Sequence, residues 1–422
     1  MTGTASVGDN LGINGLGRIG KLTIWHHVAR GHFPGIVVNV GRDVGRNLDA
    51  VCSAIERDST YGVMHRFLFG ASAEPCVRIV DGDLNQLDVA GTRITVLQEA
   101  RDPRDIEWKR NGVRVVVDAT GVFNDPTCPA DDPRGALRGH LAAGVDKVIN
   151  TAAFKVGDQG AATPDDAVTV IAGINHDAFD PVRHNLVSAA SCTTTAVAHM
   201  LKPLLDALGT SSVMTASMST VHAATNTQQV LDTLPSPGSS DLRKTRSVLN
   251  NIILTSTNAT AALEQVLPEI RQIGFMADSV RVPIPTVSLA ILNMTFQSTI
   301  DSDGRSTVSR EIINGIYSEA AVGAQRDHLV YSNDQNVPCD LAGGRAAVVI
   351  EGVETHTRTG FVNVNLASLQ GIDDRILAGV PSTMIDVPVT HAKVFGWYDN
   401  EFGSYVNMLG DLTVHVRRSL DA

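Results

Sequence analysis

Short apolar runs and longer amphipathic stretches alternate along the first part of the chain. Apolar residues recur at helical spacing over Ile19 to Ala29, directly after a short strand-like run. Runs rich in Val and Ile predict buried strands at 36–40, 94–97, 113–117 and 147–150. Because such strands and helices alternate, the pattern predicts an α/β fold with a doubly wound parallel sheet over residues 1–190.

The pattern changes in the second half of the chain. Residues 211–225 and 279–297 are long, β-branched and partly alternating, which is typical of antiparallel strands. We therefore expect a second α+β domain with a mainly antiparallel sheet over residues 191–403. The last stretch, about 404–422, has helical apolar spacing, and we expect it to return to the first domain.

A hydroxyl-rich turn joins the two halves. The apolar run from Leu186 to Ala190 predicts a strand, and helical spacing begins at Ala196, so Cys192 lies where a strand gives way to a helix. Unpaired amides and the helix dipole favour a thiolate at such a position. Cys192 is therefore a candidate nucleophile; the alternative is a small buried residue at the start of a core helix.

Three glycines near the N-terminus, Gly15, Gly17 and Gly20, fit G-x-G-x-x-G between a strand and a helix. This spacing permits a tight turn, close approach of a pyrophosphate and close helix–strand packing. The amides of Arg18 and Ile19 would face the anion at the helix N-terminus. The sequence thus predicts a Rossmann-type dinucleotide site, with an ordinary glycine-rich turn as the alternative.

The choice between NAD and NADP stays open. A dinucleotide fold usually ends its second strand with an acid that binds the ribose, but Val40 and Gly41 occupy that place. Arg42 follows, and it is either a partner for a 2′-phosphate or a solvated loop residue.

Composition narrows the expected partners, metal content and location of the protein. The net charge of −11 over 422 residues argues against nucleic acid and anionic membrane as partners. Five irregularly spaced cysteines indicate no disulfide framework and no zinc pattern, so we expect no metal. The start of the chain lacks the features of a signal peptide, and cytoplasm is the expected location.

Several motifs together resemble the phosphorylating glyceraldehyde-3-phosphate dehydrogenases. They run in family order from Ile13 to Gly403: INGLGRIG, ERDSTYG, DATGVF, AASCTTT, TVHAATNTQQVLD, NNIILTSTNATAALEQVLPEI, RVPIPTVS and WYDNEFG. Extra segments interrupt the resemblance near Asp125, Val156 and Pro235, and between Asn333 and Asp373.

The resemblance implies a role for each matching residue. Cys192 would be the nucleophile and His222 its acid–base partner. Thr225 and Arg246 would hold the terminal phosphate of the substrate, and Ser191, Thr193, Thr257 and Asn258 the inorganic phosphate. The cofactor would contact Gly15, Gly17, Arg18, Ile19, Gly20, Arg101, Thr120, Gly121 and Asn400. Taken singly, His222 is also typical of a core histidine and Arg246 of a solvated surface charge.

The implied reaction uses NAD or NADP and inorganic phosphate on a phosphorylated aldehyde. A thiolate adds to the aldehyde, hydride leaves the hemithioacetal, and phosphate releases the acyl group from the thioester, with histidine moving the proton. The family also implies a homotetramer. The alternatives are erythrose-4-phosphate dehydrogenase and a non-catalytic cofactor-binding homologue. The latter is suggested by departures from the family pattern at Thr195, Asn258 and Ser404.

Overall fold

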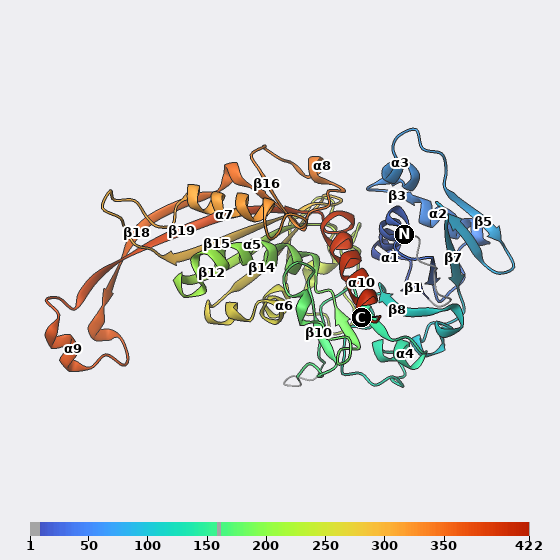
Figure 1. The fold of residues 1–422 in the computed structure, drawn as a ribbon, viewed down its shortest axis with the longest axis horizontal. Coiled ribbons are helices and arrows are strands. Elements are labelled where there is room, and N and C mark those ends of the chain that lie inside the picture. The colour runs from blue at the N-terminus through green and yellow to red at the C-terminus, as the bar shows by residue number, and fades with distance from the viewer. Residues whose placement is uncertain (1–8, 158–161, 422) are drawn as a thin grey trace.

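Two β-sheets organise the part of the chain that the computed structural model describes, residues 9–157 and 162–421 (Figure 1). The strand order of the first sheet is β10 (Ala167–Thr169), β11 (Leu186–Ser188), β9 (Lys147–Asn150), β8 (Val113–Asp118), β1 (Asn10–Asn14), β2 (Gly35–Asn39), β7 (Thr92–Leu97), β6 (Gln86–Val89) and β5 (Val77–Asp81). In this order, the strands from β10 to β7 are parallel to one another, and the last two, β6 and β5, are added in antiparallel pairs.

Alternate side chains of this sheet enter two different cores. Ile36 and Val38 pack in the core that contains Leu22, whereas Val37 packs with Trp108 and Leu137 on the other face. Both faces are therefore covered, which is why the strands are apolar throughout. The predicted α/β class with a doubly wound sheet is confirmed. The helices of this region are α1 (Arg18–Arg30), α2 (Leu48–Glu56), α3 (Met64–Phe69) and α4 (Leu137–Ala142), and a small hairpin joins β3 (Arg57–Asp58) to β4 (Gly62–Val63).

The second sheet is mainly antiparallel, as predicted. The pairs β12–β14 and β16–β17 are parallel, and the other pairs are antiparallel. The run 279–297 forms two strands rather than one, because Pro283 and Pro285 cannot donate ladder hydrogen bonds. The order is β13 (Ile253–Thr255), β14 (Met276–Val282), β12 (Val213–Ala223), β15 (Ser288–Gln297), β19 (Met384–Tyr398), β17 (Val348–Glu351) and β16 (Leu329–Ser332), with β18 (His356–Asn365) also pairing with β19.

Helix α5 (Cys192–Leu208) is the central helix of the second core. Its apolar residues Val197, Met200, Leu201, Leu204 and Leu205 are buried together with strand residues of β12, β15 and β19. Ser191 caps the helix, because its Oγ accepts a hydrogen bond from the amide of Thr194 at 3.1 Å. The other helices here are α6 (Ala259–Val266), α7 (Arg310–Val322), α8 (Pro338–Leu341) and α9 (Asp374–Gly379).

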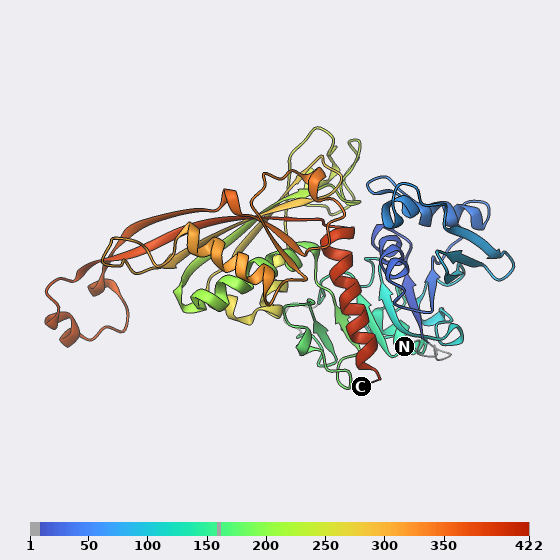
Figure 2. The same ribbon diagram turned by 45° about the horizontal axis from the view of Figure 1, so that its top comes forward.

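The end of the chain returns to the first sheet. A π-helical turn, Phe402–Val406, leads into α10 (Asn407–Ser419), and both contribute apolar residues to the core that holds α1. Figures 1 and 2 show α10 lying between the two sheets. The turn that precedes α10 is thereby held against α1.

The paired strands β18 and β19 form a long ribbon that projects from the rest of the molecule, with α9 at its tip (Figures 1 and 2). Strand β18 belongs to the extra segment between Asn333 and Asp373. Within the described ranges, no helix combines the length and the apolar character needed to cross a membrane.

Candidate active site

A cavity of about 460 Å³ is lined by residues from both halves of the chain. The starts of α1 and α5, the end of β12, strand β14 and the turn after β19 all contribute to it. Its lining includes ten residues singled out from the sequence: Arg18, Ile19, Ser191, Cys192, Thr193, His222, Thr225, Thr257, Asn258 and Asn400.

Cys192 and His222 meet in this cavity. The Cys192 Sγ lies 3.5 Å from the His222 Nε2. Tyr398 of β19 connects α5, which begins at Cys192, to β12, which contains His222. Its hydroxyl forms hydrogen bonds with the Thr193 hydroxyl at 2.9 Å and the Thr220 hydroxyl at 2.7 Å. One buried phenol thus connects the start of α5 to β12 and sets the separation of sulfur and imidazole.

Two non-glycine residues beside the cavity adopt the left-handed conformation. Ala190, with φ 56°, comes just before the cap of α5, and Val287, with φ 63°, comes just before Ser288. Such a conformation costs about 1–3 kcal/mol and persists only where the surroundings enforce it. In both places the backbone bends immediately before residues that build the site.

Arg281 sets the electrostatics of His222. Its Nη1 lies 2.6 Å from the His222 Nδ1, while the Ala223 carbonyl oxygen lies 2.7 Å from the same nitrogen. Burial, together with the charge of Arg281, lowers the pKa of His222 to about 4. The imidazole is therefore neutral at pH 7.

The thiol of Cys192 is subject to opposing effects. Its pKa is raised, because burial outweighs the charge of Arg281 and the hydroxyl and amide of Thr193, which lower it. Because His222 is neutral, a preformed thiolate–imidazolium pair is disfavoured. The positive charge next to the sulfur is supplied by Arg281 instead.

The structure does not bring Arg246 to the cavity. Its side chain is 62% exposed and pairs with Asp232 at 2.9 Å. Two cations outside the residues predicted from the sequence, Lys155 and Arg281, line the cavity. Arg281 lies in the motif RVPIPTVS, and this motif was the sequence feature that could have marked Arg281 as a site residue. The apolar pattern around Arg281 indicated only a strand.

The hydroxyl groups of the cavity are held by local bonds. The Thr225 hydroxyl donates to the Gln228 Oε1 at 3.0 Å, and the Thr257 hydroxyl accepts from the amide of Ala259 at 3.2 Å. Asn258 directly precedes α6 and makes no side-chain cap bond. The cavity that holds the sulfur is therefore lined by short polar side chains suited to an anion.

The glycine turn fits a dinucleotide. Gly15 has φ +97°, and a Cβ on Gly20 would lie 1.9 Å from the Gly15 carbonyl oxygen, whereas a Cβ on Gly17 would meet no atom of the described residues within 4 Å. No side chain in the part of the chain that the structure describes caps α1, so its first amides are available to a pyrophosphate. Thr120 adjoins this turn, since a Cβ on Gly15 would lie 3.2 Å from the Thr120 Cγ2.

Three other predicted cofactor residues, Thr120, Gly121 and Arg101, lie in or contact the turns that follow β8 and β2. The Thr120 hydroxyl donates to the Asp118 Oδ1 at 2.6 Å, and Gly121 has φ +67° in the turn that follows. Arg101 donates from Nε to the Gly41 carbonyl at 3.1 Å, at the end of β2. Arg101 thus braces the adjacent turn.

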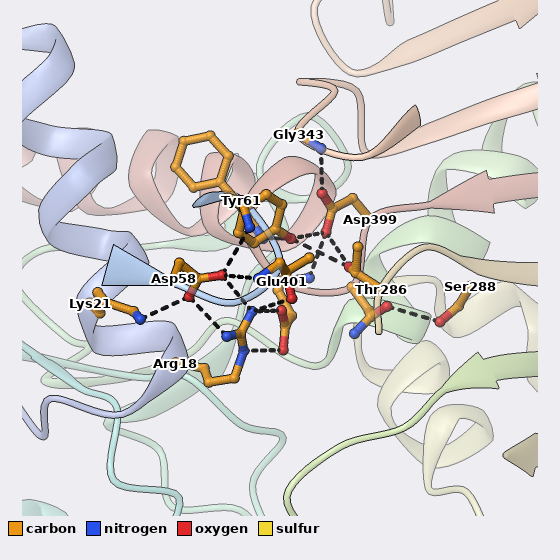
Figure 3. A network of polar contacts seen from close by, with 12 residues as sticks. Arg18, Lys21, Asp58, Tyr61, Thr286, Ser288, Gly343, Asp399 and Glu401 are labelled. Atoms are coloured by element: carbon orange, nitrogen blue, oxygen red, sulfur yellow. Dashed lines mark hydrogen bonds and ion pairs between the residues drawn. The ribbon is translucent and has the colours of Figure 1, made fainter. Parts of the chain in front are cut away.

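Arg18 belongs to a polar network that joins α1 to the turn after β19 (Figure 3). Its guanidinium donates to Asp58 at 2.8 Å and to Glu401 Oε1 at 2.6 Å. Because both carboxylates neutralise it, its contribution to an anion site is its backbone amide. The residue before Glu401 in the turn, Asn400, accepts from the Ser288 hydroxyl at 3.1 Å.

Asp399 anchors the same turn. Its Oδ1 accepts from the Tyr61 hydroxyl at 2.7 Å and from Thr286 at 3.0 Å, and its Oδ2 accepts from the Gly343 amide at 2.7 Å. These partners come from the hairpin loop between β3 and β4, the connection between β14 and β15, and the segment after α8 (Figure 3). They fix Asn400 in the cavity that also holds Cys192.

A nucleotide-binding sheet joined to a cysteine–histidine centre defines a nicotinamide-dependent oxidoreductase with a thiol nucleophile. Comparison with known proteins identifies the family. The family model described as "Glyceraldehyde 3-phosphate dehydrogenase, NAD binding domain" matches residues 9–126, and the one described as its C-terminal domain matches residues 191–367.

Curated relatives match almost the whole chain. Glyceraldehyde-3-phosphate dehydrogenase 1 of Streptomyces avermitilis is 34% identical over 411 residues, covering 97% of this chain and 99% of the relative. The enzyme of Priestia megaterium is 32% identical over 406 residues, covering 96% and 97%. Glyceraldehyde-3-phosphate dehydrogenase 1 of Bacillus subtilis is 32% identical over 408 residues, covering 97% and 98%. The chain belongs to the glyceraldehyde-3-phosphate dehydrogenase family, which confirms the resemblance seen in its motifs.

Proposed function

We propose that this chain oxidises glyceraldehyde 3-phosphate to 1,3-bisphosphoglycerate with a nicotinamide cofactor and inorganic phosphate. The observation that carries the proposal is the Sγ–Nε2 distance of 3.5 Å between Cys192 and His222, in a cavity that Arg281 also lines. Family membership supports the same substrate and reaction.

Cys192 carries the covalent chemistry. His222 takes the thiol proton as the sulfur adds to the aldehyde carbon and returns it to the carbonyl oxygen, which gives the hemithioacetal. His222 then takes the hydroxyl proton as the carbon is oxidised to a thioester. The cofactor, when bound at the glycine turn, supplies the hydride acceptor. A phosphate oxygen then attacks the thioester carbon, the acyl phosphate leaves, and the thiolate is regenerated.

The two partners of the His222 Nδ1 are mutually exclusive. A guanidinium only donates, so contact with Arg281 requires a bare Nδ1 and leaves the proton on Nε2, facing the sulfur. Contact with the Ala223 carbonyl requires a proton on Nδ1 and leaves Nε2 able to accept one. A substrate phosphate that draws Arg281 away favours the second tautomer, which is the general base.

We propose that NAD is preferred over NADP. A second pocket of about 240 Å³ adjoins Asn39 at the end of β2, where the adenosine of a dinucleotide would lie. Its lining includes Asp43, Glu99, Asp105 and Glu107, whereas Arg42 is not part of it. Carboxylates accept hydrogen bonds from ribose hydroxyls and repel a 2′-phosphate. The homotetramer and the cytoplasmic location stay predictions.

Steady-state rates test these proposals together. We expect turnover with glyceraldehyde 3-phosphate, NAD and phosphate, and a single burst of reduced cofactor when phosphate is omitted. Phosphate-independent turnover confined to erythrose 4-phosphate would favour the alternative dehydrogenase. Cofactor binding without turnover would favour the non-catalytic homologue, and a higher kcat/KM with NADP would contradict the cofactor preference.

A further inference from the structure

Three histidines, His26, His27 and His32, cluster at the end of α1, outside the cavity that holds Cys192. One ring nitrogen of each lies within 4.8 Å of those of the other two. The ring centroids are 4.9 Å apart for His26–His27, 5.5 Å for His26–His32 and 5.2 Å for His27–His32. Three imidazoles bound tetrahedrally to one zinc ion, each at about 2 Å, have centroids about 5 Å apart.

The local backbone creates this arrangement. His26 and His27 are consecutive on α1, and Gly31 then turns the chain in the left-handed conformation, with φ 58°. The turn lets the His32 amide donate to the His27 carbonyl at 3.3 Å. It also places the two Nδ1 atoms 3.0 Å apart.

His26 is oriented by a neighbour from α10. Its Nδ1 lies 3.0 Å from the Asn407 Oδ1, and the Asn407 Nδ2 donates to the Gly403 carbonyl at 2.6 Å. The Asn407 oxygen therefore accepts, so the proton of His26 is on Nδ1 and its Nε2 carries a lone pair. That Nε2 is buried and has no hydrogen-bond partner among the described residues. Metal-binding histidines characteristically donate their other ring N–H in this way.

Three arginines, Arg30, Arg345 and Arg418, lie close enough to His26 or His32 for their charges to act on these side chains. The same arginines repel a divalent cation.

A cavity of about 450 Å³ opens beside His32. Asp411 lines it together with His415 and Arg418. The cavity gives an ion access to His32 and has room for water, and the carboxylate of Asp411 opposes the charge of the arginines.

We propose that His26, His27 and His32 bind a divalent transition metal ion, with water from the adjoining cavity as a further ligand. Imidazole donors favour Zn²⁺, Ni²⁺ and Cu²⁺ over Mg²⁺ and Ca²⁺. The ion would connect the end of α1 to the turn that leads into β2. The role is structural and independent of the proposed reaction at Cys192.

Titration with Zn²⁺ tests the site. Calorimetry is best done on Cys192→Ala protein, because a cysteine–histidine pair also binds zinc. In that background we expect His32→Ala to weaken binding at least about tenfold and His356→Ala, which removes an exposed histidine of β18, to leave it unchanged. Equal affinity in all three proteins, or no binding by the parent, would overturn the proposal.

Co²⁺ provides a second readout. A site with three imidazoles gives visible d–d absorption, which we expect in the Cys192→Ala protein and not in its His32→Ala derivative. Circular dichroism checks that each variant is folded, and His32→Gln replaces His32→Ala if the latter does not fold. Identical Co²⁺ spectra with and without the His32 imidazole would place the ion elsewhere.

Discussion

His222 and His26 are both buried histidines with lowered pKa values, yet their two ring nitrogens have different partners. In His222 one nitrogen faces the sulfur of Cys192 and the other faces both Arg281 and a carbonyl. In His26 one nitrogen bonds Asn407 and the other has no hydrogen-bond partner among the described residues. Burial alone therefore does not define the role of a histidine.

The difference separates proton chemistry from metal chemistry. His222 has alternative partners at Nδ1, so its tautomer can change, and a changing tautomer suits an acid–base group. His26 has one fixed tautomer and a free lone pair, which suits a ligand. Substitutions at each site sharpen or break this comparison.

The largest effect is expected from Cys192→Ala. Loss of the nucleophile removes the covalent route, so we expect kcat to fall by about 10⁶-fold, to the background rate. Cofactor binding, measured by fluorescence titration, should be unchanged. Residual turnover within tenfold of the parent enzyme would show that Cys192 is not the nucleophile.

His222→Gln should have the next largest effect. It keeps a polar side chain but removes the proton acceptor, so we expect hydride transfer to slow by about 10²–10⁴-fold in single-turnover experiments. The Cys192 thiol should remain intact by titration with a thiol reagent. An unchanged single-turnover rate would contradict a proton-transfer role.

Arg281→Lys and Arg246→Lys form a matched pair. A lysine lacks the planar fork that binds phosphate, so Arg281→Lys should lower kcat/KM for glyceraldehyde 3-phosphate by about 10- to 100-fold. Arg246→Lys should change it little, because the structure places that side chain outside the cavity. Unphosphorylated glyceraldehyde is the control substrate. A larger loss at Arg246 would restore the role implied by the sequence.

The smallest effect concerns stability. The folded pKa of His222, about 4, lies below the ordinary value of 6.5, so the unfolded chain binds more protons as the pH falls below 6.5. The free energy of unfolding should therefore fall between pH 7 and 5.5 by about 1 kcal/mol for each such histidine. Urea unfolding should show a shallower pH dependence for His222→Gln than for Cys192→Ala. Equal slopes would contradict the lowered pKa.

Local sequence patterns predicted the elements that carry the site. Alternating strands and helices define the first sheet, and the spacing after Cys192 predicts α5, because both depend on neighbours a few residues away. Gly15, Gly17 and Gly20 were recognisable for the same reason. Their backbone requirements are local.

Contacts between distant segments could not be predicted in this way. Arg281 meets His222 because β14 and β12 pair in parallel with these two residues in register, and no periodicity reports that register. The orientation of His26 depends on Asn407, which follows 381 residues later. Arg246 has a plausible motif position, but its exposure depends on how the loop packs.

The most direct test is mass spectrometry of enzyme quenched in acid after mixing with glyceraldehyde 3-phosphate and NAD in the absence of phosphate. We predict one 3-phosphoglyceroyl group per chain, on the peptide that contains Cys192, formed together with one equivalent of NADH. An adduct on Cys52, Cys76, Cys128 or Cys339 instead, or NADH formation without any adduct, would contradict the assignment of Cys192 as the nucleophile.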